Sequence, residues 1–506
     1  MPLAFICFGV TALIELSLWL PELWKWRHYI ASVTIILLAV STGLILGNHF
    51  KVWACLLFII SLYRIINLLR LLEGRTQADY LFQVARRSSL ILIASQIALL
   101  AIAGLSRSYG VSGIVWWSLL AAGQLAAACV IIASTWRHLR TTLPPLIDAA
   151  YADHDLPSLT VAIPARNETD DLELCLQSLI QSNYPKLEIL VLDDCSQNRR
   201  TPEIIRGFAH DGIRFIAGKE PPLQWAPKNY AYQQLVEQAN GELVLFCGVD
   251  TRFEPDSLRQ IVEILLVKHK AMLSLMPKNL APTKRRLTSL LVQPTRYAWE
   301  LALPRRFLNR PPVLSTCWVI TRQALASAGG FKAVSRNHTP ESYFAKYAAG
   351  HDDGYSFLQS DPSIGLTCAK TLAEQRSTAI RTRYPQTHRR PEVVMILSLL
   401  ELAILIGPFG LFVGSILANS WALAAISLLA ATGQVAAYSL VVRLTYRQFV
   451  PASFWLLPFA TLLDIAVLNY SMWQYEFGLV EWKNRNICIP IMHVTKQLPL
   501  TNPDSE

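Results

Sequence analysis

The sequence predicts a polytopic membrane protein in which an α/β domain with a mostly parallel sheet is inserted between two groups of transmembrane helices. Three β-type runs that end in polar or acidic residues predict the sheet: Leu159–Glu168, Leu190–Ser196 and Leu243–Thr251. The intervals between them fit one helix between successive strands, so ligand-binding groups would gather at the carboxyl ends of the strands. Membrane helices are predicted because 52% of the 506 residues are hydrophobic and only 16% are charged.

Eight apolar segments approach the length of about 20 residues that a helix needs to cross a bilayer. Five lie near residues 3–20, 29–47, 52–70, 88–106 and 114–135, and three lie near 393–417, 419–442 and 453–475. The first has no basic leading region and no small-residue cleavage site, so we interpret it as a span and not as a signal sequence. We expect an N-terminal membrane region at 1–140, a soluble domain at 141–392, a C-terminal membrane region at 393–476 and a tail at 477–506.

The basic residues predict that the soluble domain is cytoplasmic, since Lys and Arg in short loops stay on that side. The loop 71–87 and the two segments that flank the domain, near Arg140 and at Arg381–Arg390, are all basic. We therefore expect a multi-pass protein of the inner or plasma membrane. The net charge of +10 fits such loops beside anionic lipid, and no aromatic-interleaved basic patch suggests a nucleic-acid partner.

The last apolar segment, 453–475, poses a problem of parity. The loop before it and the tail after it are both basic, so the segment should enter and leave the membrane on one side. It also contains Pro458 and Asp464. These residues favour a broken re-entrant or interfacial element, with a complete span as the alternative.

Within the soluble domain, apolar runs and helical periodicity alternate in order. The predicted strands are 158–163, Lys186–Leu192, 213–217 and Gly241–Phe246, and the predicted helices are Asp170–Ser182, 201–210, 228–239 and Glu254–Lys268. This order is typical of strand–helix–strand units in a parallel sheet.

Four segments carry a family resemblance, and none of them is specific alone. They are the loop Ala165–Glu168, the acidic pair in Leu192–Ser196, the segment Trp225–Ala231 and the run Asn240–Thr251. In the last run, Asp250 stands at the second Asp of an Asp-x-Asp metal motif. In this order the four segments resemble family-2 inverting glycosyltransferases of GT-A fold. The closest likeness is to the polytopic membrane branch that includes ceramide, carotenoid and hopanoid-associated glycosyltransferases, and it covers roughly residues 155–390.

The resemblance implies a nucleotide-sugar donor, and the candidate donor ligands are Ala165, Arg166, Glu168, Asp193, Asp194 and Lys228. The two acids could instead be turn residues, and Lys228 could be a solvated cation at a helix end. A donor diphosphate needs basic residues or a hard cation such as Mg²⁺ or Mn²⁺, which prefers carboxylate oxygen. Asp250 is the candidate metal ligand, although Gly248 stands where the family has its first motif acid.

An inverting transfer also needs a general base that accepts the proton of the acceptor hydroxyl. The family supplies an acid after a Gly-Gly segment, and Glu341 takes this place in the segment that follows Ala328–Phe331. Glu341 could alternatively stabilise the start of a helix, because Thr339 and Pro340 form a typical N-cap and first position. His338 is the second candidate base. Asp352 and Asp353 are interpreted as turn residues.

A Gln/Arg-rich segment, Glu374–Tyr384, loosely resembles the family segment that leads into the membrane. Arg381, Arg383 and Tyr384 are candidates for binding the leaving diphosphate, or the two arginines could be ordinary inside-positive residues. Gly478–Arg485 resembles the Trp-Lys-Gly-Arg signature that follows the last membrane segment in this branch.

Three functions stay open at this point. The first is the transfer of one sugar to a lipid or polyprenoid-type acceptor in the membrane. The second is processive polysaccharide synthesis, which usually has a stronger Gln-x-x-Arg-Trp motif. The third is an inactive membrane scaffold, which the residues at Gly248 and Glu341 make conceivable. The sugar and the acceptor depend on pocket shape and cannot be read from the sequence.

Overall fold

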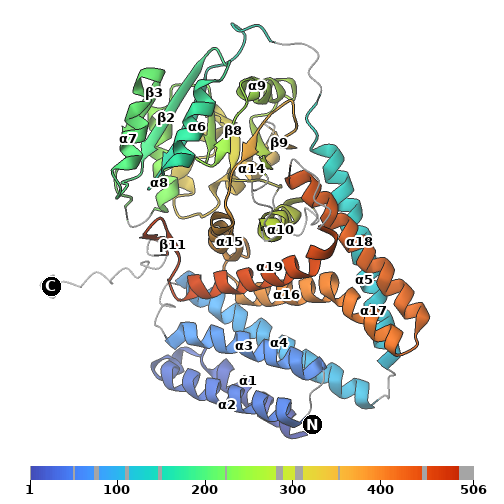
Figure 1. Cartoon of the computed structure of the whole chain (residues 1–506). Helices are drawn as coiled ribbons and strands as arrows, with labels where there is room; N and C mark the ends of the chain where they lie inside the picture. The colour runs from blue at the N-terminus through green and yellow to red at the C-terminus, as the bar shows by residue number, and fades with distance from the viewer. Residues whose placement is uncertain are drawn as a thin grey trace, which may run out of the picture.

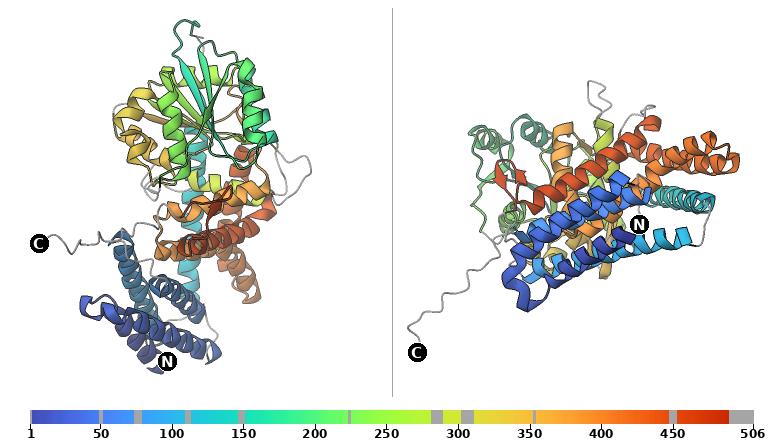
Figure 2. Two further views of the ribbon diagram at one scale, coloured as in Figure 1. Left: turned by 90° about the vertical axis from the view of Figure 1, so that its left-hand side faces the viewer. Right: turned by 90° about the horizontal axis from the view of Figure 1, so that it is seen from below.

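The α/β domain and the apolar helices form two distinct layers of the molecule. The computed structural model describes residues 2–48, 52–72, 79–108, 113–145, 151–222, 225–280, 289–301, 311–351, 354–446 and 453–488. The domain lies at one end and the N-terminal helices at the other (Figures 1 and 2). The predicted turn residues Asp352 and Asp353 lie outside the described residues.

A seven-stranded sheet forms the centre of the domain, in the order β3-β2-β1-β4-β8-β6-β9. All neighbouring pairs are parallel except the two that involve β8, which is antiparallel to β4 and β6. The sheet is therefore of the mostly parallel, GT-A-like type predicted. Its strands are β1 (Leu159–Ala165), β2 (Leu187–Asp193), β3 (Ile213–Ala217), β4 (Leu243–Cys247), β6 (Met272–Met276), β8 (Cys317–Thr321) and β9 (Tyr355–Gln359). The four predicted strands are β1 to β4, and β6, β8 and β9 were not predicted.

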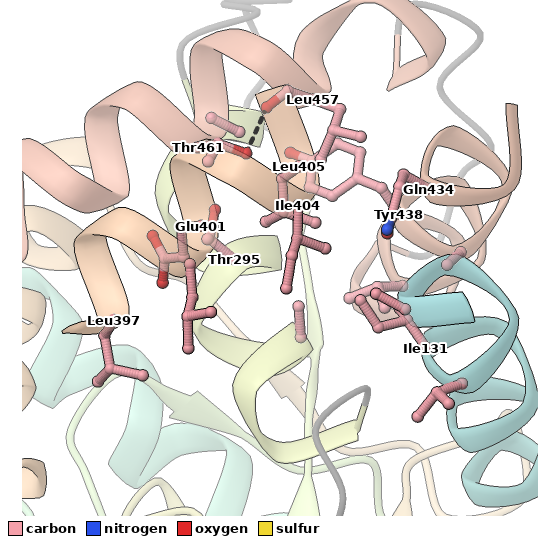
Figure 3. A pocket seen from close by; sticks show the side chains of 17 residues that line it. Ile131, Thr295, Leu397, Glu401, Ile404, Leu405, Gln434, Tyr438, Leu457 and Thr461 are labelled. Carbon is pink, nitrogen blue, oxygen red and sulfur yellow. Dashed lines mark hydrogen bonds between the residues drawn. The ribbon is translucent and has the colours of Figure 1, made fainter. Parts of the chain in front are cut away.

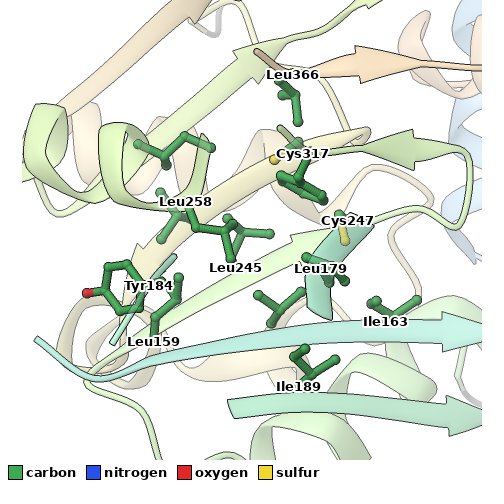
Figure 4. Packing of buried hydrophobic residues seen from close by; sticks show 14 of the residues in the cluster. Leu159, Ile163, Leu179, Tyr184, Ile189, Leu245, Cys247, Leu258, Cys317 and Leu366 are labelled. Carbon is green, nitrogen blue, oxygen red and sulfur yellow. The ribbon is translucent and has the colours of Figure 1, made fainter. Parts of the chain in front are cut away.

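Both faces of this sheet are buried, which explains why its strands are continuous apolar runs. Successive residues of a strand point to opposite faces. Accordingly, Val161 and Leu245 belong to one buried cluster, and Ala162 and Phe246 belong to the other. Figure 4 shows part of the first cluster. Helices α6 (Asp170–Ile180) and α9 (Ser257–Val267) pack against the first cluster, and α8 (Pro227–Gln238) and α14 (Pro340–Gly350) pack against the second.

Short elements complete the domain. Helices α7 (Arg200–Gly207), α12 (Arg322–Ser327) and α13 (Gly330–Ala333) and the 3₁₀ turn η3 (Ala209–Asp211) lie between strands. A small sheet of β5 (Thr251–Arg252), β10 (Thr367–Cys368) and β7 (Lys278–Asn279) extends from the end of β4. Two further helices, α10 (Ser289–Leu301) and α15 (Leu372–Gln386), lie between the main sheet and the membrane helices (Figure 1).

Seven helical stretches of the described residues are long and apolar enough to cross a membrane. They fall within α2 (Arg27–Asn48), α3 (Val52–Leu72), α4 (Asp79–Ser108), α5 (Gly113–Thr141), the continuous unit α16 (Pro391–Glu401), η4 (Leu402–Ile406) and α17 (Gly407–Leu417), α18 (Trp421–Thr445) and α19 (Ser453–Glu476). The first predicted span is shorter, because α1 (Pro2–Ser17) has 16 residues and a 3₁₀ turn, η1 (Pro21–Trp26), follows it. At 1.5 Å per residue α1 reaches about 24 Å, less than the hydrocarbon thickness of about 30 Å.

The segment predicted to be broken, 453–475, is instead one continuous helix, α19, that contains Pro458. The irregular turn lies in a different helix, because α16 and α17 are joined by the π-type turn η4. Pro408 explains this position, since its ring has no N–H and would clash with the carbonyl group four residues earlier in a regular helix. Whether α19 crosses the bilayer or lies at its surface stays a prediction.

Candidate active site

A cavity of about 440 Å³ lies beside the carboxyl ends of β1 and β4. Its wall comes from the loops after these strands, from α8, α14 and α15, and from a C-terminal hairpin that follows α19. Six of the twelve predicted site residues line it: Glu168, Lys228, Asp250, His338, Glu341 and Arg381. Segments far apart in the chain therefore place these side chains around one space.

Asp250 is buried where β4 passes into β5, and it is already paired. Its Oδ2 atom lies 3.0 Å from Lys370 Nζ and accepts a hydrogen bond from Cys368 Sγ at 3.0 Å. Burial alone would raise the pKa of Asp250, but Lys370 and the bond from Cys368 outweigh it, and the pKa lies below the usual value. Asp250 is thus an anion. A Cβ atom at Gly248 would lie 2.3 Å from Asp250 Oδ1, so the carboxylate occupies the room that a side chain at 248 would need.

The protein offers a metal ion a single carboxylate at this point. Among the described residues no group of three or more His, Cys, Asp or Glu side chains is placed to hold a metal. Mg²⁺ commonly binds through one or two carboxylates while substrate phosphates and water complete its shell. Asp250 fits such a site, provided that the ion displaces the ammonium group of Lys370.

Glu341 lies in the first turn of α14, behind Pro340 at the first helical position. It is only 5% exposed, and its Oε2 atom has no hydrogen-bond partner among the described residues. Thr339 makes no side-chain bond to the start of the helix. A buried carboxylate oxygen without a hydrogen-bond partner is costly. Its presence at a cavity wall favours contact with a ligand over helix capping as the role of Glu341.

Lys228 and His338 flank Glu341 in the cavity wall. Burial lowers the pKa of Lys228 below its usual value, and the carboxylate of Glu341 offsets only part of this effect. Burial and then the guanidinium groups of Arg389 and Arg381 lower the pKa of His338 to about 3. A base with so low a pKa is neutral and weak at pH 7, which disfavours His338 as the general base.

Asp194 is held by the C-terminal hairpin and does not line the cavity. Arg485 Nη1 lies 3.1 Å from both of its carboxylate oxygens, and Arg485 Nη2 lies 2.7 Å from Glu220. Burial raises the pKa of Asp194 to about 6, even though Arg485 acts in the opposite direction. Arg166 donates to the carbonyl oxygens of Asp194 and Cys195 at 2.5 and 2.7 Å, so it braces this loop.

The neighbouring predicted donor ligands have structural roles in the loops after β1 and β2. Asp193 accepts a bond from the backbone of Ser196 at 3.2 Å, as a turn residue does. Ala165 is fully buried at the end of β1. Cys195 adopts a left-handed conformation with φ of 53°, a region that Gly enters at little cost.

The hairpin of β11 (Glu481–Trp482) and β12 (Arg485–Asn486) closes one side of the cavity. Its two turn residues, Lys483 and Asn484, both have positive φ, as a tight hairpin turn requires. Lys483 Nζ lies 2.9 Å from Glu168 Oε2, and the guanidinium of Arg381 lies 5.6 Å from the ring centre of Trp482. The predicted site residues did not include Lys370, Trp482, Lys483 or Arg485. The resemblance at Gly478–Arg485 was the only signal for the hairpin.

Of the three predicted donor ligands in the Gln/Arg-rich segment of α15, Arg381 alone lines the cavity. Arg383 is buried in an ion pair with Asp464 of α19. The hydroxyl of Tyr384 donates to the carbonyl of Arg389 at 2.8 Å, and Ser471 of α19 accepts from its backbone N–H. Arg383 and Tyr384 therefore fasten α15 to α19, away from the cavity.

The cavity presents four basic groups (Lys228, Lys370, Arg381 and Lys483) and four acidic groups (Glu168, Asp250, Glu341 and Glu374). A diphosphate placed here would meet several cations, and charge-assisted hydrogen bonds to such cations are the strong ones. The carboxylate of Glu341, whose Oε2 atom has no hydrogen-bond partner among the described residues, lines the same cavity. The arrangement can therefore bind an anionic leaving group and accept a proton from a nucleophile.

Comparison with known proteins shows what the α/β domain is similar to. Residues 160–328 match the model of glycosyl transferase family 2. Glycosyltransferase AglE of Haloferax volcanii is 33% identical over 99 residues, which are 19% of this chain and 31% of that protein. The probable glycosyltransferase YdaM of Bacillus subtilis is 31% identical over 121 residues, or 23% of this chain and 28% of that protein. The matched stretch thus spans less than a third of either relative.

Solved structures are similar at lower identity. The mannosyltransferase PcManGT from Pyrobaculum calidifontis, solved in complex with GDP-Man and Mn²⁺, is 20% identical with a TM-score of 0.41, and the match covers 71% of this chain and 98% of that one. TarS from S. aureus is 16% identical with a TM-score of 0.31, covering 63% and 55%. The match over 160–328 lies within the α/β domain and covers about a third of the chain, so this domain is similar to glycosyl transferase family 2.

Proposed function

We propose that this protein transfers a sugar from a nucleotide-diphosphate donor to a hydroxyl group of a lipid acceptor in the membrane, with inversion at the anomeric carbon. The observation that carries the proposal is the carboxylate of Glu341, which faces the cavity without a hydrogen-bond partner among the described residues. The cations that surround it suit a leaving diphosphate. Helices that can cross a membrane lie directly beneath α10 and α15, which favours an acceptor that resides in lipid.

Each residue then has a defined part in the transfer. Glu341 accepts the proton of the acceptor hydroxyl while that oxygen forms its bond to the anomeric carbon. The bond from the anomeric carbon to the diphosphate oxygen breaks, and the electron pair leaves with the diphosphate. Arg381 and Lys483 neutralise the charge that develops there, as oriented cations do most effectively in a site that excludes water.

Asp250 would hold the divalent cation that the family implies, and such an ion supplies further neutralisation of the diphosphate when it is bound. In its absence Lys370 neutralises Asp250. Glu168 is fixed by Lys483 of the hairpin, so donor binding and hairpin position depend on each other. The domain is expected on the cytoplasmic side, where nucleotide sugars are available to it.

Product analysis tests the proposal. The purified full chain in vesicles is supplied with radiolabelled UDP- and GDP-hexoses and with total lipid extract from its host cells. A lipid-soluble product that carries one sugar is the expected result. A polymer would indicate processive synthesis, and no product with any donor would favour an inactive scaffold; either outcome overturns the proposal.

Asp250→Asn is the matched test of the donor site, since it keeps the shape of the side chain but removes its charge. We expect it to abolish metal-dependent nucleotide binding and to lower transfer by about 10² or more. Asp155→Asn changes the same residue type at an exposed position far from the cavity, so it should leave transfer unchanged. Normal turnover of Asp250→Asn would remove Asp250 from the mechanism.

A further inference from the structure

A second cavity, of about 280 Å³, lies among the membrane helices (Figure 3). Helices α5, α18 and α19, the unit α16–η4 and the side of α10 that carries Thr295 and Ala298 form its wall. Twelve of its 17 lining residues are Ala, Val, Leu or Ile. Its volume is almost twice that of an engineered apolar cavity of about 150 Å³ that binds benzene, so it has room for roughly ten carbon atoms.

The irregular turn of the membrane region is part of this cavity. Ile404 and Leu405 of η4 line it, and Gln124 of α5 donates to the carbonyl of Ala403 at 2.8 Å. A π-type turn leaves backbone carbonyls poorly paired, and Gln124 satisfies one of them from a neighbouring helix. This hydrogen bond from Gln124 therefore stabilises the π-type turn. Turns of this type occur frequently at functional sites.

Gln434 of α18 and Glu401 of α16 line the cavity with polar atoms that have no hydrogen-bond partner among the described residues, and both polar atoms of the Gln434 side chain lack one. Gln434 is 1% exposed, and neither its amide nitrogen nor its amide oxygen has a hydrogen-bond partner among the described residues. It lines the cavity from α18, next to Tyr438 (Figure 3). An amide buried in a membrane without a partner is costly, so a ligand that bonds to it would be strongly preferred over one that does not.

Helix α10 forms part of the wall of the membrane cavity and also carries a charge that acts on the catalytic one. Thr295 and Ala298 line the membrane cavity, whereas Arg296 lies within electrostatic reach of Lys228 and Arg381 in the catalytic cavity. An elongated amphiphile could therefore have its reactive end near Glu341 and its chain among the membrane helices. The solvent around these helices is lipid hydrocarbon, which suits an apolar wall.

We infer that the membrane cavity binds the hydrocarbon chain of the lipid acceptor, at a position where that chain carries a hydrogen-bonding group for Gln434. The inference rests on the proposed function and names the class of acceptor: an amphiphile with a polar group, such as a hydroxyl, within its apolar part. A fully saturated, unsubstituted chain would leave Gln434 unsatisfied and would bind more weakly.

Photolabelling of the full chain in vesicles tests this directly. Two probes are used, a hexadecanol with a mid-chain diazirine and the same molecule with an additional mid-chain hydroxyl. We expect the second probe to label peptides of 127–131, 434–441 and 457–461 about tenfold more than the first. Ala437→Phe, which fills the cavity, should lower this labelling at least tenfold and raise the acceptor KM at least fivefold, while the donor KM stays unchanged.

Leu429→Phe is the matched control, because Leu429 lies on the same helix but is 60% exposed on its outer side. It should change neither labelling nor KM.

If Ala437→Phe does not fold, Gln434→Leu tests the inference in its place, since it should abolish the preference for the hydroxylated probe. Equal labelling by both probes in the wild type, or undiminished cavity labelling in Ala437→Phe, would overturn the inference. Labelling does not depend on sugar transfer, so an inactive protein would refute the proposed function and leave this result readable.

Discussion

The general base is the prediction that the structure defines most sharply. Glu341→Gln keeps the volume of the side chain and removes the ability of the carboxylate to accept a proton. Loss of general base catalysis typically costs 10² to 10⁴ in rate, so we expect kcat to fall by about 10² or more, or about 2.7 kcal/mol of transition-state stabilisation. Donor affinity at pH 7 should change little, because Glu341 acts in the transition state.

A role in helix capping predicts a different outcome for the same substitution. Removing a favourable charge at a helix start costs roughly 1 kcal/mol of stability and leaves turnover near normal. The structure favours the first outcome, because Glu341 is buried with a free Oε2 atom at the cavity wall. The assay is single-turnover transfer of radiolabelled sugar to lipid, together with thermal unfolding of each variant in the same vesicles.

Two matched variants separate the candidates further. Glu341→Asp keeps the charge but shortens the reach, and it should retain more activity than the Gln variant. His338→Ala should lower kcat by less than tenfold, since a pKa of about 3 makes His338 a weak base. Normal turnover in Glu341→Gln combined with an inactive His338→Ala would refute the assignment of Glu341.

Three further predictions concern other parts of the molecule. Arg485→Met leaves the buried carboxylate of Asp194 without its cation, so the hairpin should detach, seen as faster hydrogen exchange at 479–488, and donor affinity should fall about tenfold or more. Asp464→Leu removes the carboxylate that pairs with the buried guanidinium of Arg383 and should destabilise the protein by about 3–5 kcal/mol, measured as a lower Tm; an unchanged Tm would contradict the role of this pair in joining α15 to α19. A single Cys near residue 110 should be labelled from outside the cell in a Cys-depleted background, whereas one near residue 76 or 504 should not; outside labelling at 504 would make α19 a complete span.

The predictable part of the fold is the part with long, uniform patterns. Strands β1 and β2 and the helix between them follow from continuous apolar runs and from helical periodicity. Strands β6 and β8 are five residues each, and an apolar run of that length does not by itself distinguish a strand from a helix turn. Strands β3 and β4 are equally short, but each lies between two predicted helices. The antiparallel insertion of β8 between β4 and β6 is a tertiary feature that no local pattern specifies.

The candidate site shows the same limit in its chemistry. Glu341 and Asp250 were predicted from motifs, and the structure brings both to one cavity. Their neighbours were not predicted, because the contacts join distant parts of the chain: 291 residues separate Arg485 from Asp194, and 315 separate Lys483 from Glu168. Basic residues after a last membrane helix are usually explained by topology, and this explanation gave no reason to expect Lys483 at the cavity.

Helix α19 links the two cavities in one rigid element. Its N-terminal half lines the membrane cavity with Leu457 and Ala460, and its C-terminal end leads within a few residues to the hairpin that contacts Asp194 and Glu168. Between these ends Asp464 and Ser471 hold α15, the helix that carries Arg381. One helix therefore contacts the cavity proposed for the acceptor chain, leads to the hairpin beside the catalytic cavity, and holds the helix that carries Arg381. A membrane anchor alone would need only the apolar length of α19, whereas these contacts require its exact register along α15.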